Sequence, residues 1–519
     1  MQSLLRRLLQ RSYVQVILGA IALLAVVALN GRPSVFTDTD DYYAQGRGAA
    51  HAVKPVVQAI VRPILHAWGA DDDADYRAAA ADEDHTSMAA RSPYYGIFLY
   101  GTYRIGGLWL TATLPALACA FTLFALMRGL FGRPTPLAYL GVMVFVAAAT
   151  TLPFFAGFAM PDVLAALGAA ATVALALFWD GYSRAERFGL VGVILGSLWS
   201  HTSHILLEIL LIVALVPLYW LTRVRLRDGA LRLGLLLACI VSAIGSDMAY
   251  HQVVLMRTGE DLHRPPFLTA RVLADGPGRL WLRQACQHAN PYVLCAYKRD
   301  PLDNSDEILW ADDPARGIFN ASKIKTRILL DEEEKSFVIA AVTHYPVEQL
   351  AASLSNWWDQ LNMVDLAEPL RDPGYYFTNV YWRDTSLPGL IPGGKACLKQ
   401  PKLCRPQLNV ITLWWWHRGV ILASLAFLLW RLTRPDMVSA LLSRDPAPPG
   451  GRRAFLAATA LILYALLVNS AVTGILSGPF SRYNSRIIWL APALAAMLLG
   501  AFGPGFDYKG LIARVKSRG

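Results

Sequence analysis

Three carboxylates stand together in the segment Phe36-Thr-Asp-Thr-Asp-Asp-Tyr-Tyr43, at Asp38, Asp40 and Asp41. In an extended segment Asp38 and Asp40 point the same way, because side chains alternate with a period of two. Paired carboxylates either bind a divalent cation or act as a general base, since crowding raises the pKa of one of them. The alternative is a solvated acidic loop. A triple of this kind directly after an apolar helix favours a catalytic function.

Two further groups of polar residues adjoin apolar segments. His201 and His204, with Glu208 one turn later, have a spacing that can ligate a metal ion. Alternatively, they are hydrogen-bonded structural residues at a helix junction. Asp247 and His251 stand one turn apart and either pair with each other or line a cavity. A divalent metal ion is the one cofactor that the sequence suggests.

Long apolar blocks must position these residues. The chain of 519 residues is 55% hydrophobic and only 17% charged, with a mean hydropathy of +0.37, which is too apolar for a soluble protein of this length. The blocks are about twenty residues long, as helices that cross a bilayer require. We therefore predict an all-α polytopic membrane protein with about ten transmembrane helices. The predicted spans are 13–30, 106–130, 136–157, 162–179, 188–200, 203–221, 232–255, 411–431, 454–476 and 487–503.

The charged residues predict the orientation of these spans. The net charge of +10 does not indicate a nucleic-acid partner, because the basic residues gather in short loops beside apolar blocks, as the positive-inside rule describes. Residues 31–92 instead carry ten acidic and six basic side chains. The first span is interpreted as an uncleaved helix rather than a signal peptide, because no small-residue cleavage site is obvious after it. We predict a bacterial inner-membrane protein with both termini cytoplasmic and its active face periplasmic.

Four of the six cysteines lie in one long loop, at about 256–410. They are Cys286, Cys295, Cys397 and Cys404. Their grouping into two close pairs predicts two local disulfides, which need an oxidising compartment. Four free thiols are the alternative. The disulfide interpretation agrees with the charge pattern in placing this loop outside the cytoplasm.

Both outer loops are expected to contain structure of their own. In the first, 31–105, the apolar spacing of Val53–Trp68 and the tyrosines of Pro93–Tyr103 predict two interfacial helices. In the long loop, Glu332–Leu361 predicts a helix, and the aromatic segment Gly374–Trp382 predicts either a strand or a platform, which makes the domain mixed. The predicted domains are an N-terminal transmembrane module (1–255), an extracytoplasmic loop domain (256–410) and a C-terminal transmembrane module (411–519).

The first 260 residues resemble the GT-C superfamily of membrane glycosyltransferases, which includes protein O-mannosyltransferases, the aminoarabinose transferase of lipid A and oligosaccharyltransferases. The shared layout is a first helix, an acidic motif and two interfacial helices. The acidic motif is Asp38, Asp40 and Asp41, the Pro-aromatic run is Arg91–Tyr100, and Met160-Pro-Asp162 supplies an acid at the start of the fourth span. The large outer domain departs from the family, because in many members it is C-terminal.

This resemblance implies transfer of a sugar from a polyprenyl-phosphate donor to an extracytoplasmic acceptor, which is a glycan, a lipid or a protein. The acceptor hydroxyl attacks the anomeric carbon while a carboxylate removes its proton. The candidate catalytic carboxylates are Asp38, Asp40, Asp41 and Asp162. Arg482 and Arg486, four residues apart with Tyr483 between them, are candidates to hold the donor phosphate. Alternatively, both arginines snorkel at the membrane interface.

Two other functions stand beside the transferase. A transporter or flippase of a lipid or polysaccharide is expected to show charges in mid-span, broken helices and repeated halves. The predicted spans contain few mid-span charges, and the acids cluster at one face, which favours an enzyme. A non-catalytic subunit of an envelope assembly complex would use the disulfide-bonded loop as its docking surface.

Overall fold

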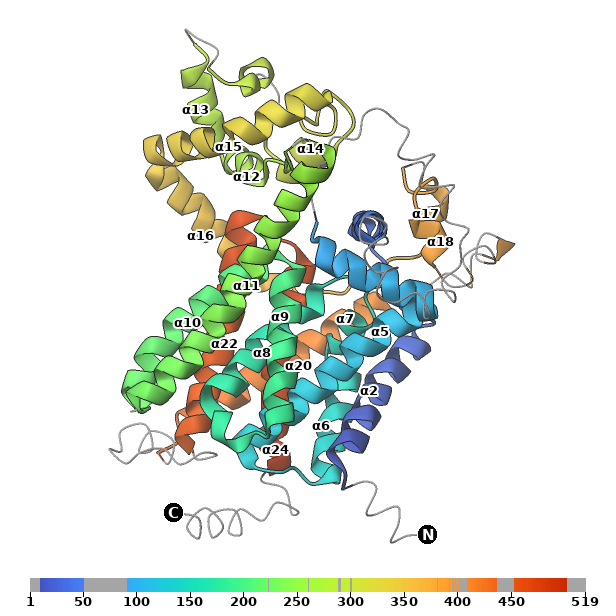
Figure 1. Cartoon of the computed structure of the whole chain (residues 1–519), viewed down its shortest axis with the longest axis vertical. Helices are drawn as coiled ribbons and strands as arrows, with labels where there is room; N and C mark the ends of the chain where they lie inside the picture. Colours follow the sequence, from blue (N-terminus) through green and yellow to red (C-terminus); the bar gives the residue numbers. More distant parts are fainter. Residues whose placement is uncertain are drawn as a thin grey trace.

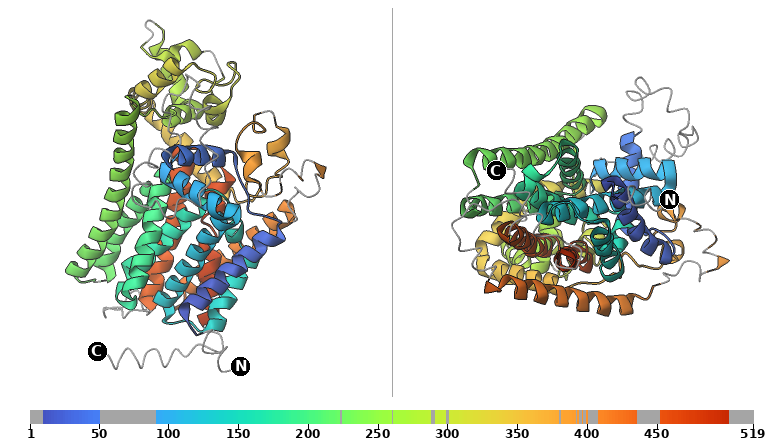
Figure 2. Two further views of the ribbon diagram at one scale, coloured as in Figure 1. Left: turned by 45° about the vertical axis from the view of Figure 1, so that its right-hand side comes forward. Right: turned by 90° about the horizontal axis from the view of Figure 1, so that it is seen from below.

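Helices make up the described structure. The computed structural model describes residues 10–50, 91–222, 224–259, 261–287, 291–298, 301–379, 381–391, 393, 396, 399–400, 408–435 and 452–501. These residues contain no strand, and one isolated parallel bridge joins Ser34 to Phe158. A bundle of long helices carries a smaller helical domain at one end, as Figures 1 and 2 show. We call this end of the bundle the domain end.

The bundle supports the predicted membrane-protein class. Its helices are α2 Ser12–Leu29, α5 Pro93–Phe131, α6 Pro136–Ala149, α7 Leu152–Ala156, α8 Asp162–Phe178, α9 Arg184–Ser200, α10 Thr202–Thr222, α11 Leu226–Thr258, α20 Val410–Leu432, α22 Arg452–Leu476, α23 Ser481–Ser485 and α24 Leu490–Ala501. Seven of the described helices (α2, α5, α8, α10, α11, α20 and α22) are long and apolar enough to cross a membrane. The count of ten spans stays a prediction, because α6, α9 and α24 have only 14, 17 and 12 residues.

Helix α8 lies inside the bundle because its small side chains let neighbouring helices approach. Its sequence is mostly Ala, Gly and Leu, and nearly all of its residues are buried. A Cβ added at Gly168 would lie 2.5 Å from Ser197 Oγ of α9, which is closer than real Cβ contacts. Asp162 begins this helix and is therefore placed inside the protein rather than on its surface.

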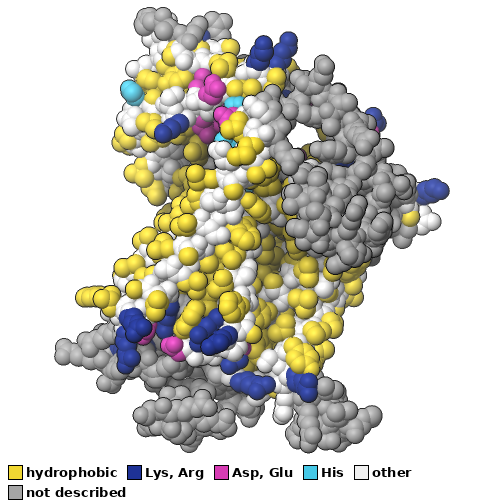
Figure 3. Space-filling model, in the orientation of Figure 1, with side chains coloured by type: hydrophobic (Ala, Val, Ile, Leu, Met, Phe, Trp, Pro, Cys, Tyr) yellow, Lys and Arg dark blue, Asp and Glu magenta, His cyan; other side chains and the backbone are white. Residues whose placement is uncertain are grey.

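The surface of the bundle is divided by chemistry. On the face drawn in Figure 3, apolar side chains cover the middle of the bundle, and Lys and Arg gather at the end opposite the domain. Lys and Arg are enriched at the cytoplasmic ends of membrane helices. The domain end is therefore expected to face away from the cytoplasm.

Cysteine labelling tests this orientation. We expect a cysteine introduced at the exposed Gly181, in the turn after α8, to react with a membrane-impermeant thiol reagent only from the cytoplasmic side. A cysteine at the exposed Ala315, in the helical domain, should react only from the other side. Among the described residues the free cysteines are Cys119 and Cys239, and both are buried. The unsubstituted protein measures the background reaction of all native cysteines. Reaction of both introduced cysteines from one side would show that the predicted orientation is wrong.

Helix α5 is broken at Gly106 and Gly107. The φ of +62° at Gly107 is one that favours glycine, and both residues have non-helical backbone angles. The break coincides with the boundary expected between the interfacial helix Pro93–Tyr103 and the second span. Ser92 caps this helix and also donates a hydrogen bond of 2.5 Å to the carbonyl of Trp199 on α9, which fixes the start of the helix. The other predicted interfacial helix, 53–68, lies outside the described residues.

Residues 37–50 form a helix, and the extended conformation expected for the acidic motif is therefore wrong. Thr39 Oγ1 accepts a hydrogen bond of 2.9 Å from the N–H of Phe36, which satisfies a backbone donor at the helix start. The helix crosses α5 closely, because a Cβ added at Gly46 would lie 2.0 Å from the carbonyl oxygen of Gly96. This crossing brings the acidic motif against the first turns of α5.

The domain at the end of the bundle has a hydrophobic core of its own. Its helices are α12 Phe267–Asp275, α13 Pro277–Ala285, α14 Ser305–Trp310 and α15 Ile324–His344, and α16 Pro346–Asn362 leads back to α22 of the bundle. Figure 2 shows α11 rising along one edge of the bundle toward this domain. A disulfide joins Cys286 to Cys295 and confirms that prediction. The predicted pair of Cys397 and Cys404 lies outside the described residues.

Two predictions for the long loop are corrected by the structure. The expected helix over 332–361 is divided between α15 and α16, because Pro346 begins a new helix after Tyr345. The aromatic segment Gly374–Trp382 contains the short helix α17 Tyr375–Thr378 and no strand, so the described part of the domain is helical and not mixed. Tyr376 packs into the core of the bundle and not into that of the domain.

Candidate active site

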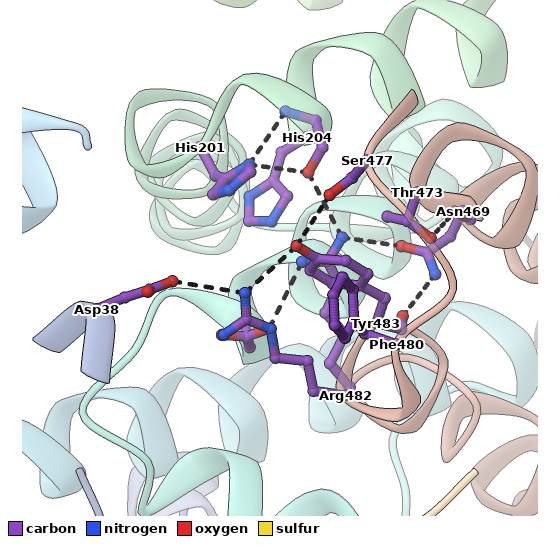
Figure 4. A network of polar contacts seen from close by, with 12 residues as sticks. Asp38, His201, His204, Asn469, Thr473, Ser477, Phe480, Arg482 and Tyr483 are labelled. Atoms are coloured by element: carbon purple, nitrogen blue, oxygen red, sulfur yellow. Dashed lines mark hydrogen bonds and ion pairs between the residues drawn. The ribbon is translucent and has the colours of Figure 1, made fainter. Parts of the chain in front are cut away.

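Asp38 lies between two arginines from distant parts of the chain. Its Oδ1 is 2.8 Å from Arg91 Nη2, and its Oδ2 is 3.4 Å from Arg482 Nη2. Figure 4 shows Asp38 and Arg482 pointing toward each other. Burial alone would raise the pKa of Asp38, but Arg91 and Arg482 outweigh burial and hold the pKa below its usual value. Asp38 is therefore ionised at neutral pH and positions the two arginines rather than accepting a proton.

Asp41 follows one turn later on the same helix and is more accessible. Its Oδ2 is 3.8 Å from Arg91 Nε, and 51% of its side chain is exposed. The pKa of Asp41 is raised to about 6, chiefly because the surrounding protein removes water from the carboxyl group. Arg91 lowers this pKa, whereas the negative charges of Asp38 and Asp40 raise it. An accessible carboxylate that titrates near neutral pH is suited to accept a proton from a substrate.

Asp40 points away from Arg91 and contacts another part of the chain. Its Oδ1 accepts a hydrogen bond of 2.9 Å from the backbone N–H of Ser386, next to the short helix α18 Leu387–Leu390. Residues three apart lie on the same side of a helix, and Asp38 and Asp41 accordingly both contact Arg91. The expected pairing of Asp38 with Asp40 is wrong for this reason.

Arg482 is a buried cation with several partners. Its side chain is 12% exposed, and its Nε lies 3.6 Å from Glu368 Oε2 in addition to the contact with Asp38. Its guanidinium lies over the rings of Phe36 and Tyr483, at 4.5 and 4.9 Å from their centroids. Within the described residues Arg482 Nη1 has no hydrogen-bond partner. A buried cationic donor of this kind can bind an anionic oxygen of a ligand.

Arg486 lies deeper and faces another carboxylate. Its Nη1 is 3.5 Å from Asp162 Oδ1, with side chains only 2% and 4% exposed, and its Nη2 donates a hydrogen bond of 3.1 Å to Asn469 Oδ1. The ring of Tyr483 contacts both arginines, at 4.9 Å from Arg482 and 5.1 Å from Arg486. The two guanidinium groups share this ring but contact different carboxylates, Asp38 and Glu368 for Arg482 and Asp162 for Arg486. Arg486 and Asp162 connect α8 to the segment before α24.

The histidine group is held by local hydrogen bonds. His201 Nδ1 accepts from the backbone N–H two residues further on, at 3.1 Å, and His204 Nδ1 donates to the carbonyl of Ser197, at 2.9 Å. Glu208 accepts a hydrogen bond from Thr172. In the part of the chain that the structure describes, no three His, Cys, Asp or Glu side chains are grouped to hold a metal ion. The geometry favours the hydrogen-bonded alternative for these residues.

Asp247 and His251 neither pair with each other nor contact Arg91, Arg482 or Arg486. Asp247 forms an ion pair with Arg264, at 2.7 Å, and His251 Nε2 lies 3.6 Å from Asp261. Both contacts join α11 to the segment that follows it. These residues therefore fix the segment that leads from α11 into the helical domain.

Three residues of this region were not predicted from the sequence. Glu368 contacts Arg482. Burial raises the pKa of Glu368 to about 7, because its effect is larger than the opposing attraction of Arg482. Asp306 of α14 interacts electrostatically with Asp38, Arg482 and Arg91, and Arg91 lies 5.7 Å from the ring centroid of Trp310. No sequence motif indicates that Glu368 or α14 lies near the acidic motif. The Arg-Ser-Pro start of α5 was the available signal for Arg91, because it places a cation at a capped helix end.

We call Asp38, Asp41, Arg91, Glu368 and Arg482 the arginine–carboxylate cluster. Comparisons of the chain with family models, curated proteins and solved structures found no match. The functional interpretation therefore uses the geometry of this cluster.

Proposed function

We propose that this chain is a membrane glycosyltransferase that moves a sugar from a polyprenyl-phosphate donor to a hydroxyl acceptor on the extracytoplasmic side. The observation that supports it is the convergence of Arg91 and Arg482 on Asp38, beside the accessible carboxylate of Asp41. The reaction needs cations for a leaving phosphate and a base for a hydroxyl proton within reach of one bound substrate. The cluster offers both.

In the proposed reaction the acceptor oxygen attacks the anomeric carbon of the donor sugar. Asp41 takes the proton of the attacking hydroxyl. The bond between the anomeric carbon and the phosphate oxygen breaks, and polyprenyl phosphate leaves with the electron pair. Arg482 stabilises the charge that develops on the leaving phosphate, for which its Nη1 is available. Asp38 positions Arg91 and Arg482 and does not exchange protons.

Donor binding by the purified protein tests this proposal. A synthetic farnesyl-phosphate sugar should bind saturably, farnesyl phosphate should compete with it, and farnesol should not, because the phosphate is the group that the arginines recognise. Failure of the donor to bind would exclude the transferase. A flippase would also bind it but would move it intact across the bilayer of a proteoliposome, whereas the transferase releases lipid phosphate.

The pH dependence of transfer follows from two carboxyl groups. Asp41 must be ionised to act as a base, so kcat/KM should rise about tenfold per pH unit below its pKa of about 6 and level off above it. Ionisation of Glu368 above its pKa of about 7 adds a negative charge beside Arg482, so donor affinity should fall there. A profile between pH 4.5 and 8.5 measures both limbs. In Glu368→Gln only the upper limb should disappear, and a flat lower limb in the wild type would contradict the role of Asp41.

A further inference from the structure

Helix α16 has an inverted distribution of polar and apolar side chains. Its outer surface carries Val347, Leu350, Leu354 and Trp358, whose side chains are between 51% and 74% exposed. Residues spaced by three and four positions lie on the same face of a helix, so these four form one apolar stripe. A helix on the surface of a water-soluble domain shows the opposite pattern, with its apolar face buried. We call these four residues the α16 stripe.

The opposite face of α16 is polar and lies against the protein. Gln349 Nε2 and Asn356 Nδ2 donate to the two carboxylate oxygens of Asp275 on α12, at 2.9 and 2.8 Å. The side chain of Gln360 is fully buried, and its amide exchanges two hydrogen bonds with the backbone of Phe480, at 2.8 and 3.0 Å. Polar contacts therefore hold α16 on the protein, and its apolar residues are left on the outside.

Contacts with α22 place the last turns of α16 beside a membrane-spanning helix. The segment Arg453–Leu476 of α22 is long and apolar enough to cross a membrane. A Cβ added at Gly474 would lie 2.8 Å from the carbonyl oxygen of Asn356. Trp357 Nε1 donates at 3.2 Å to the carbonyl of Leu467, which lies about two turns further from the domain end. Helix α16, which descends from the domain to the end of α22 in Figure 1, therefore overlaps the domain end of this span.

Tryptophans indicate the same membrane level on a second span. Arg418 of α20 donates at 2.5 Å to the carbonyl of Asn362, the last residue of α16. The first turns of α20 also carry the exposed side chains of Trp415 and Trp416. Tryptophan is enriched where membrane helices meet the lipid headgroups. The end of α16, with the exposed Trp358, therefore lies near the expected boundary of the bilayer.

We propose that α16 is an interfacial membrane helix, with the α16 stripe against the lipid chains of the bilayer at the domain end. The charged residues of the helix, Glu348 and Asp359, are exposed at the side of the stripe, where they can reach headgroups or water. Phe480, which Gln360 holds, directly precedes the helix that carries Arg482. The same helix thus contacts lipid on one face and holds the Arg482 segment on the other. The lipid contact does not depend on the proposed function.

Spin-label accessibility of the protein in lipid nanodiscs tests this inference. Nitroxides on Leu350→Cys and Leu354→Cys are compared with two references. Val241→Cys, at an exposed position of the span α11, reports on lipid, and Ala315→Cys, at an exposed position of the domain, reports on water. Collision rates are measured with oxygen, which concentrates in the bilayer, and with a water-soluble nickel chelate. The oxygen-to-nickel ratio at both stripe positions should be nearer to that at Val241 than to that at Ala315.

Glu348→Cys is the matched control on the same helix, because Glu348 is exposed but lies beside the stripe. Its ratio should be lower than that at Leu350, and the unsubstituted protein supplies the background signal of the native cysteines. Ratios at Leu350 and Leu354 nearer to that at Ala315 would overturn the inference, because the stripe would then face water. Low collision rates with both reagents would also overturn it, because a protein surface, such as a second copy of this chain, would then cover the stripe.

Discussion

Replacing Asp41 with Asn should lower the rate of sugar transfer by about two to four orders of magnitude, the range that general-base catalysis contributes. Asn keeps the size of the side chain and removes its ability to take a proton. The donor should still bind, because the contacts of Arg91 and Arg482 with Asp38 remain. The measurement is the single-turnover rate with saturating donor, together with donor affinity from a separate titration.

Asp40→Asn is the matched control for this prediction. Asp40 belongs to the same acidic motif, but its carboxylate accepts from the backbone of Ser386. Asn keeps an oxygen that can accept this hydrogen bond, so Asp40→Asn should leave transfer within about tenfold of the wild type and change the stability by less than about 1 kcal/mol. If Asp40→Asn abolishes transfer and Asp41→Asn does not, the assignment of the base is wrong.

Replacing Arg482 with Ala should weaken donor binding by about 1.5–3 kcal/mol, which is the usual contribution of a hydrogen bond to a charged group. The loss should be specific for the phosphate, so the variant should bind a farnesyl-phosphate sugar and farnesol with similar, low affinity. Arg482→Lys keeps the charge but not the planar set of donors, and it should recover part of the affinity. Equal affinity of the wild type and Arg482→Ala for the donor would remove this arginine from the proposed site.

Arg486→Ala is expected to behave differently, although it lies only four residues away. Its loss leaves Asp162 as a buried charge without its ion-pair partner, and breaking a buried pair costs about 3–5 kcal/mol. The expected result is a lower unfolding temperature with little specific change in phosphate recognition. Arg482→Ala also removes a partner of Asp38 and Glu368 and should lower the unfolding temperature as well, so the two variants are distinguished by the phosphate-specific loss of binding, which is expected in Arg482→Ala alone.

Several elements could be predicted because their signals are local. The start of α5 combines a Ser cap, a proline at the first turn and a later pair of glycines, and these bound the helical segment Pro93–Tyr103 that we predict to be interfacial. The apolar blocks predicted the helices of the bundle, since each block must satisfy its own backbone in hydrocarbon. Cys286 and Cys295 are nine residues apart, close enough for a local disulfide.

The remaining features depend on contacts that no local pattern contains. Thr and Asp are poor helix formers, so the acidic motif did not indicate a helix, and it is the close crossing at Gly46 and Gly96 that accommodates one there. Asp38 and Arg482 are 444 positions apart, and neither sequence segment indicates the other as its partner. The His-x-x-His spacing suggested a metal because it resembles a ligand pattern, but His201 caps the end of α9 and His204 belongs to α10.

The central claim is that the arginine–carboxylate cluster directs attack at the anomeric carbon of a lipid-phosphate sugar. Water can replace the unidentified acceptor when this claim is tested. The measurement is slow hydrolysis of a farnesyl-phosphate sugar by the purified protein in ¹⁸O-labelled water, with both products analysed by mass spectrometry. We predict that the label enters the sugar, that farnesyl phosphate is released unlabelled, and that Asp41→Asn releases it far more slowly. Label in the phosphate, or no release of farnesyl phosphate although the donor binds, would contradict the transferase proposal.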